Sequence, residues 1–150
     1  MATSFDEFAR ELRAFADSKA VVNEVRRDLR KPLPALRSAI RESAVSKLPA
    51  RGGLGAWVAR ATLTVRLRTT GRTAGIKLKL SRKSGKGKAD LKAMDDSGAV
   101  RHPLYGDRRH WYPQTVTPGF FTEPWKDSED EWRRMADEAV DRAFDKIRRG

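Results

Sequence analysis

The segment from Arg101 to Trp125 constrains this chain more than any other, because it is rich in both proline and aromatic residues. Its four prolines are Pro103, Pro113, Pro118 and Pro124. Each proline lacks a backbone donor and biases the preceding residue away from the helical region, so no continuous helix can cover the segment. Its aromatic side chains nevertheless need a surface to bury against: Tyr105, Trp111, Tyr112, Phe120, Phe121 and Trp125. We therefore expect an ordered, irregular ribbon that packs on the core of the chain or on another subunit.

The length and composition limit the class of protein. A chain of 150 residues favours a single domain over 1–150. The absence of cysteine excludes a disulfide framework and a thiolate metal site. The segment Phe5–Leu29 is heavily charged, unlike a signal sequence, and no apolar run is long enough to cross a membrane. These features predict a protein made in the cytoplasm, without a membrane partner.

The net charge of +12 is concentrated in the middle of the chain. Residues 51–97 carry 12 Lys and Arg against 3 Asp and Glu, whereas residues 98–150 carry 10 of each sign. A basic stretch of this kind implies an anionic neighbour, which is either phosphate or an acidic protein surface.

Residues 1–48 are predicted to form a bent helical arm. A capping-box signature begins at Ser4, and apolar residues then recur at helical spacing, which predicts one helix over Phe5–Leu29. Pro32 and Pro34 interrupt that helix, after which the helical spacing resumes to the end of the arm. Packing of the arm against a sheet is favoured over contact with a neighbouring protomer, which is the alternative.

The segment Leu48–Gly55 contains Arg-Gly-Gly-Leu and predicts a mobile loop. Beyond it, apolar and polar residues alternate over 62–68 and over 76–80, which predicts two antiparallel strands with one apolar face. The strands and the Gly/Ser/Lys-rich tip that follows them carry eight cations: Arg66, Arg68, Lys77, Lys79, Arg82, Lys83, Lys86 and Lys88. We name this set of cations the basic hairpin. Like charges repel across a ladder, so these cations indicate either an anionic partner or a need for solubility alone.

Three further short strands are predicted at Leu91–Met94, Ala99–Tyr105 and His110–Val116. The last is expected at an edge, because Pro113 cannot donate to a ladder. Together with the basic hairpin they would complete a β meander over 56–117.

A second capping box opens at Ser128 and predicts an amphipathic helix over 128–149, with an acidic first turn and a basic last turn. The predicted fold class is therefore α+β. A small, mostly antiparallel sheet of three to five strands would be packed by the long N-terminal helix and by this C-terminal amphipathic helix.

Few residues could carry chemistry. His102 and His110 are the only imidazoles, and even with Asp107 between them they provide too few ligands for a structural metal site. We interpret them as hydrogen-bonding or packing groups. No serine lies in a nucleophile motif, and cysteine is absent. The sequence therefore predicts no enzymatic activity, no metal and no cofactor.

Binding to nucleic acid is the main alternative function. The basic hairpin would supply the electrostatic footprint, and Trp57, Tyr105 or Trp111 could stack on bases. These aromatic residues are not interleaved with the cations, and the sequence has no zinc-finger, RRM or KH pattern. The alternative is accordingly a small basic protein that binds DNA without sequence specificity.

Several motifs together resemble a known family. They are Pro49 with the following Arg51-Gly-Gly-Leu54, the stretch Gly98–Gly106 that leads to Trp111, and the Pro-Gly-Phe-Phe of 118–121. With a long helical start and a closing helix, this organisation resembles the neck or tail-completion proteins of long-tailed bacteriophages, especially those of actinobacterial hosts. The resemblance extends over nearly the whole chain.

The resemblance implies a structural virion protein, a minor tail component without enzymatic activity, assembled in the cytoplasm of the host bacterium. It implies a homo-oligomeric ring, a hexamer or a dodecamer, at the head–tail junction. Its partners would be connector or head-closure proteins and a tail terminator or tail tube protein. The basic hairpin would face the lumen or a partner, where it would meet genome DNA without sequence specificity. A tail terminator is a second alternative, because both proteins are small ring-forming α+β domains.

The same resemblance places Arg101–Gly106 at a sheet edge and Pro118–Trp125 at a strand-to-helix turn. We name the residues expected to anchor neighbouring subunits the interface ribbon: Arg101, His102, Tyr105, Trp111, Phe120, Phe121 and Trp125.

Overall fold

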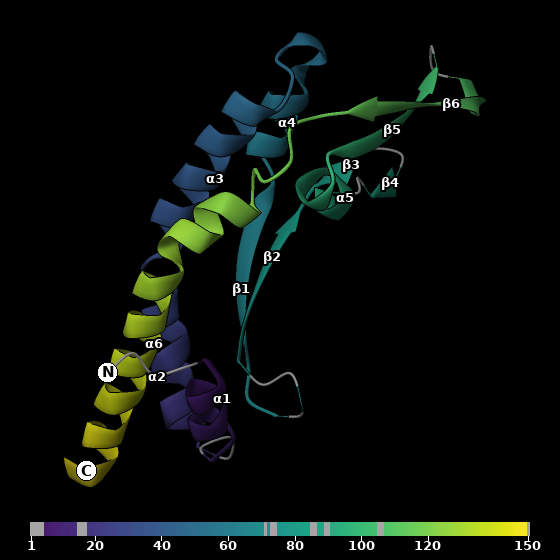
Figure 1. Ribbon diagram of the computed structural model, residues 1–150. Helices are drawn as coiled ribbons and strands as arrows, with labels where there is room; N and C mark the ends of the chain where they lie inside the picture. The colour runs from purple at the N-terminus through teal and green to yellow at the C-terminus, as the bar shows by residue number, and fades with distance from the viewer. Residues whose placement is uncertain are drawn as a thin grey trace. The chain divides into compact units, whose positions relative to one another are not determined.

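The computed structural model describes residues 5–14, 18–70, 72, 75–84, 87–88, 91–104 and 107–149 (Figure 1). Helices and strands both contribute to it, so the fold is α+β, as predicted. The chain divides into two compact units. Unit 1 comprises Met1–Leu36, Leu63–Lys79 and Asp127–Gly150, and unit 2 comprises Arg37–Thr62 and Leu80–Lys126. A helix or strand continues across every boundary between these stretches, so the two units are interleaved in sequence.

Unit 1 is mainly helical. It contains α1 (Phe5–Ala14), α2 (Lys19–Leu29), the start of α3 (Leu33–Lys47), most of β1 (Thr62–Arg68) and β2 (Gly75–Ser81), and most of α6 (Thr122–Arg149). Its buried apolar side chains recur at helical spacing on α2 and α6 and at every fourth residue of β1: Val21, Val22, Val25, Leu29, Leu63, Leu67, Trp132, Ala136, Ala139, Val140 and Ala143. These side chains form the core of unit 1.

The hairpin of β1 and β2 has the predicted faces. The two strands pair in a two-stranded sheet. Leu63 and Leu67 are buried, whereas Arg66 between them is exposed. The hydroxyl of Thr64 donates across the pair to the carbonyl of Lys79 at 3.3 Å. The alternation of apolar and polar residues therefore predicted these strands correctly, because it matches the two faces of a pleated strand.

The predicted single helix over Phe5–Leu29 is wrong, because the arm is two helices. Ser18 has an extended backbone, with φ −89° and ψ 96°, and its side chain accepts the backbone N–H of Val21 at 3.4 Å. A serine in this conformation is an N-cap, and it begins α2 instead of continuing α1. Ser4, the expected cap of the first helix, lies outside the described residues.

The interruption by proline is confirmed. After α2 ends at Leu29, a turn over Arg30 and Lys31 leads into α3. Pro34 occupies the first turn of α3, where a helix needs no N–H from it. The helical face that follows remains buried as far as Leu48, as predicted.

A buried carboxylate ties α2 to α6 within unit 1. Asp28 is 1% exposed and accepts hydrogen bonds from Arg142 at 3.0 and 3.3 Å, while Lys31 Nζ lies 2.7 Å from its other oxygen. Burial by itself would raise the pKa of Asp28, but the hydrogen bonds from Lys31 and Arg142 outweigh it and hold that pKa below its usual value. Nearby, Lys146 Nζ lies 2.7 and 2.8 Å from the two carboxylate oxygens of Glu24. This hydrogen-bonded pair lowers the pKa of Glu24.

Unit 2 contains the remaining elements. They are the rest of α3, the 3-10 helix η1 (Arg51–Gly53), α4 (Leu54–Ala59), β3 (Lys83–Ser84), β4 (Gly87–Lys88), α5 (Leu91–Asp96), β5 (Ala99–Leu104), β6 (Asp107–Thr115) and the first turn of α6. Its buried apolar side chains are Ile40, Ala44, Leu48, Val58, Ala61, Leu91, Met94, Val116 and Phe120.

Two local predictions in unit 2 are wrong. The expected mobile loop of Leu48–Gly55 is instead the ordered turn η1 followed by the start of α4. The expected strand Leu91–Met94 is the helix α5. Leu91 and Met94 are both buried, and residues three apart share a face in a helix but not in a strand. The strands predicted after them are present as β5 and β6.

The C-terminal helix is present but begins at Thr122, six residues before the predicted cap at Ser128. Its cap is distant in sequence. One carboxylate oxygen of Asp95 accepts the backbone N–H groups of Phe121 at 2.7 Å and Thr122 at 3.1 Å, and the other accepts the Thr122 hydroxyl. Pro124 fits the first turn that this cap begins. Asp95 therefore supplies the acceptor that the free N–H groups at a helix start require.

The predicted sheet of three to five strands is wrong. Among the described residues the strands form three sheets of two strands each: β1 with β2, β3 with β4, and β5 with β6. In the last of these, Pro103 pairs with Trp111 and Arg101 pairs with Pro113. Both strands thus contain a residue without an N–H, which limits the ladder that a further strand could join. None of the described helices is long and apolar enough to cross a membrane.

Candidate interaction surfaces

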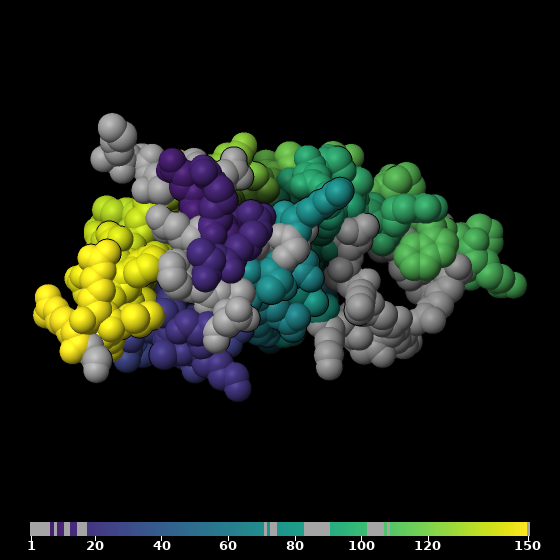
Figure 2. Space-filling model, turned by 90° about the horizontal axis from the view of Figure 1, so that it is seen from below, coloured from purple at the N-terminus to yellow at the C-terminus, as the bar shows by residue number. Residues whose placement is uncertain are grey.

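The β5–β6 hairpin of unit 2 exposes large aromatic side chains. Trp111 is 49% exposed and Tyr112 is 54% exposed, and every residue of β6 from Arg109 to Thr115 is exposed. The strands pair antiparallel, with a register shift at Pro103 and Leu104. In Figure 2 the side chains of β6, drawn in green, lie on the surface. Both faces of this strand are therefore open to a partner.

Local contacts organise the start of β6. Asp107 accepts the backbone N–H of Arg109 at 3.0 Å and its Nε at 3.3 Å, and His110 Nδ1 lies 3.0 Å from the other carboxylate oxygen. The backbone hydrogen bond from Arg109 and then the His110 contact hold the pKa of Asp107 below its usual value. Within the described part of the chain, no group of three His, Asp or Glu side chains could hold a metal ion. Asp107 and His110 thus act as a local structural pair.

The other residues of the interface ribbon differ in their surroundings. Arg101 is exposed on β5. Phe120 is 0% exposed, so it belongs to the core of unit 2 and cannot anchor a partner. Phe121 and Trp125 are half-buried at the start of α6. Of His102 the structure describes only the backbone, within β5, and Tyr105 lies outside the described residues.

The cations of the basic hairpin are divided between the two units. Arg66, Arg68, Lys77 and Lys79 are exposed cations of unit 1. The remaining four cations belong to unit 2. Of these, Arg82 packs on a tryptophan ring, Lys83 and Lys88 are described only as backbone of β3 and β4, and Lys86 lies outside the described residues.

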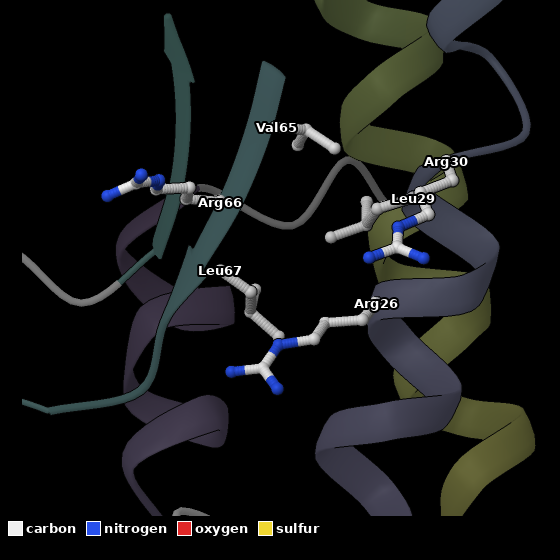
Figure 3. A pocket seen from close by; sticks show the side chains of 6 residues that line it. All are labelled: Arg26, Leu29, Arg30, Val65, Arg66 and Leu67. Carbon is white, nitrogen blue, oxygen red and sulfur yellow. The ribbon is translucent and has the colours of Figure 1, made fainter.

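Unit 1 has a hollow of about 330 Å³ beside β1 (Figure 3). Leu29, Val65 and Leu67 supply its apolar lining. Arg26 of α2 and Arg30, which directly follows α2, extend into the space that faces the strand. Arg66 points away from them on the opposite side of β1 (Figure 3). None of these three arginines pairs with a carboxylate of a described residue. This part of unit 1 is therefore cationic on both sides of β1.

Unit 2 has a larger groove, of about 750 Å³, which we name the Trp57 groove. Its lining is mostly apolar: Gly52, Gly53, Leu54, Trp57, Ala93, Met94, Ala99 and Val100, with Arg60 and Arg101. The two glycines have φ of 81° and 73°, and no other atom lies within 4 Å of where a Cβ would stand. Glycine is therefore needed there for the left-handed backbone that starts α4, not for space.

A cation is fixed over the aromatic ring of this groove. The guanidinium carbon of Arg82 lies 5.6 Å from the centre of the Trp57 ring, within the range of a cation–π contact. Arg82 also donates a hydrogen bond of 3.3 Å to the carbonyl of Arg60. These two contacts bring a cation of the basic hairpin to the same groove as Arg101 of the interface ribbon.

The sequence did not reveal the groove itself. The sequence predicts only a base-stacking role for Trp57, and it does not indicate that Leu54, Arg60 and Met94 line the same groove. The one local signal is the Arg-Gly-Gly-Leu motif, of which Gly52, Gly53 and Leu54 line the groove. Comparison of the chain with family models, with curated proteins and with solved structures found no match.

Proposed function

We propose that this protein is a structural component of a tailed bacteriophage, a neck or tail-completion protein that forms a homo-oligomeric ring at the head–tail junction. In this role it joins the connector to the tail tube and carries out no catalysis. The observation that supports the proposal most directly is the exposed aromatic hairpin β5–β6 of unit 2.

The hairpin is a poor candidate for a surface that remains in water. An isolated two-stranded ribbon is only marginally stable there. Covering the exposed halves of Trp111 and Tyr112 would remove roughly 100 Å² of each ring from water, which contributes about 2.5 kcal/mol per side chain. Aromatic residues of this kind are typical anchors of protein interfaces. A neighbouring subunit would provide the missing cover.

The shape of the strands favours side-chain packing over strand addition. Pro103 and Pro113 interrupt the donors of β5 and β6, so another chain cannot extend the ladder along their full length. The hairpin of one copy would then rest on a different surface of the next copy. Contacts between two different surfaces generate rings when the rotation closes, which suits a hexamer or a dodecamer.

The test is the mass of the assemblies in solution, measured by light scattering or native mass spectrometry. We expect a closed oligomer for the unmodified chain and a shift to monomer for Trp111→Ser/Tyr112→Ser. Val45→Ser is the matched control, because Val45 is 58% exposed in unit 2 but lies on α3. A chain that is monomeric at every concentration would contradict the proposal. If the chain does form a closed oligomer, its position in an imaged particle would distinguish a neck protein from a tail terminator.

Binding of DNA without sequence specificity is the second candidate function, and one observation favours it. Five cations of unit 1 do not pair with any described carboxylate: the exposed Arg66, Lys77 and Lys79, together with Arg26 and Arg30. Contacts with phosphates make affinity fall steeply with salt. Tight, salt-dependent binding of duplex DNA by a monomer would favour this function over the ring.

A further inference from the structure

The Trp57 groove is an apolar surface without a described cover. Leu54 and Trp57 come from α4, Met94 from α5 and Val100 from β5, so three elements of unit 2 build it. Binding sites in proteins are usually concave and lined mostly by apolar side chains with a few polar groups, as this groove is. The nature of its occupant follows from the charges at its edge.

Two arginines line the groove and a third, Arg82, lies over its tryptophan ring; none of the three has an acidic partner among the described residues. Arg60 and Arg101 line the groove and are exposed. The Nε of Arg60 donates to the carbonyl of Ala56, at 3.4 Å. Arg82 is half-buried and is held by the Trp57 ring and by the Arg60 carbonyl. A partly buried cation without an anion gains most from a partner that brings one.

We propose that the Trp57 groove docks an acidic segment of a neighbouring polypeptide, one that carries a large apolar side chain between its carboxylates. The apolar side chain packs on Leu54, Met94 and Val100. The carboxylates meet Arg60 and Arg101 at the edge, where a guanidinium can bind a carboxylate through two hydrogen bonds. The proposal rests on the proposed function only for where that neighbour is found, which is in the virion.

Two other occupants fit less well. A nucleic acid would need an open aromatic face, but one face of Trp57 is already covered by Arg82, and the aliphatic lining offers no groups for base edges. The β5–β6 hairpin of a second copy would bring Arg108 and Arg109 toward three further arginines. Like charges brought together at an interface oppose binding. The acidic segment alone complements both the apolar lining and the charge.

The test uses the full chain and short fluorescein-labelled peptides, with fluorescence polarisation as the readout. The probe peptide has glutamates on both sides of a central Leu-Phe pair. One control peptide has lysines in place of the glutamates, and another has serines in place of Leu-Phe. We expect the probe to bind at least about 10-fold more tightly than either control, because each control removes one of the two complementary features.

The matched variants separate the groove from general charge. Arg60→Glu/Arg101→Glu should weaken binding of the probe by about 10-fold or more, since repulsion replaces attraction at two sites. Arg41→Glu should change it less than about twofold, because Arg41 is an exposed cation of α3 in unit 2 that does not line the groove. All of these substitutions are at exposed positions, and circular dichroism would verify that the variants fold.

Several outcomes would overturn the inference. Equal binding of the probe and the serine peptide would show that no apolar side chain anchors the peptide. Equal effects of the two variants would show that the groove is not the binding site. Tighter binding of a single-stranded oligonucleotide at this groove would assign it to nucleic acid. Loss of self-association in Arg60→Glu/Arg101→Glu would assign it to a second copy. The proposed ring is tested separately, since peptide binding is measured whether or not the chain assembles.

Discussion

Replacement of Asp95 should destabilise unit 2 by an amount that the contacts allow us to estimate. Its carboxylate is 8% exposed and accepts the N–H groups of Phe121 and Thr122 as well as the Thr122 hydroxyl. Asp95→Ala removes three part-buried hydrogen bonds, two from the backbone N–H groups at the start of α6 and one from the Thr122 hydroxyl, at about 1 kcal/mol each. The expected loss is therefore about 3 kcal/mol. Asp95→Asn keeps one acceptor oxygen and should cost about 1 kcal/mol.

Urea denaturation followed by circular dichroism gives these differences, and hydrogen exchange of the Phe121 and Thr122 amides locates them. Asp96→Ala is the matched control, because the neighbouring Asp96 is exposed and forms an ion pair with Lys92, one turn away on α5. An exposed pair of this kind is worth less than about 0.5 kcal/mol. Equal stability of Asp95→Ala and Asp96→Ala, or unchanged exchange at those two amides, would refute the capping role of Asp95.

Three further outcomes are expected. The pKa of Asp28 is lower in the folded chain than in the unfolded one, so its stabilisation is complete above about pH 4 and is lost as the pH falls further; thermal melts should show a shallower acid decline for Asp28→Asn than for the unmodified chain. Gly98→Ala should lower the free energy of unfolding in urea by more than about 2 kcal/mol, because Gly98 has φ of 70° and a Cβ would stand 2.0 Å from the Val116 carbonyl oxygen. Gly52→Ala should lower it by only about 1 kcal/mol, because Gly52 has φ of 81° but no atom within 4 Å of where a Cβ would stand. Replacement of Arg66, Arg68, Lys77 and Lys79 by Gln should leave the free energy of unfolding within about 0.5 kcal/mol of that of the unmodified chain but reduce the yield of phage particles. A normal yield of particles would contradict a role of these cations in assembly.

The local patterns predicted the elements whose causes are themselves local. Alternation identified β1 and β2, since a strand has one buried and one solvated face. Pro32 and Pro34 separated α2 from α3, because proline acts on its own backbone and on that of its predecessor. The C-terminal helix was identified by its long apolar face.

The elements that were missed depend on distant contacts or on competing signals. Leu91 and Met94 are too few to distinguish a helical period from a strand, and α5 is anchored through Asp95, whose partners lie at residues 121 and 122. Because of the same contact, α6 begins at Thr122 and not after Ser128, although the sequence at Ser128 has a complete local capping signal. In contrast, Ser18 was a local signal that the continuing apolar spacing concealed. Sequence spacing alone could not rank these competing signals.

The division of the basic hairpin into two settings explains why its charge alone does not identify a partner. Arg66, Lys77 and Lys79 are exposed to solvent, where salt screens their charges. A polyanion such as DNA would bind them mainly because it releases its condensed counterions. Arg82 is half-buried, fixed over Trp57 at 5.6 Å beside an apolar groove. A cation in such a place is less screened, and its fixed guanidinium favours a partner of matching shape. Salt would also screen the contacts of an acidic segment with the exposed Arg60 and Arg101, but it would not screen the packing of the apolar side chain of that segment in the Trp57 groove. Added salt should therefore weaken any contact of DNA with unit 1 more than it weakens the docking of an acidic, apolar segment in unit 2.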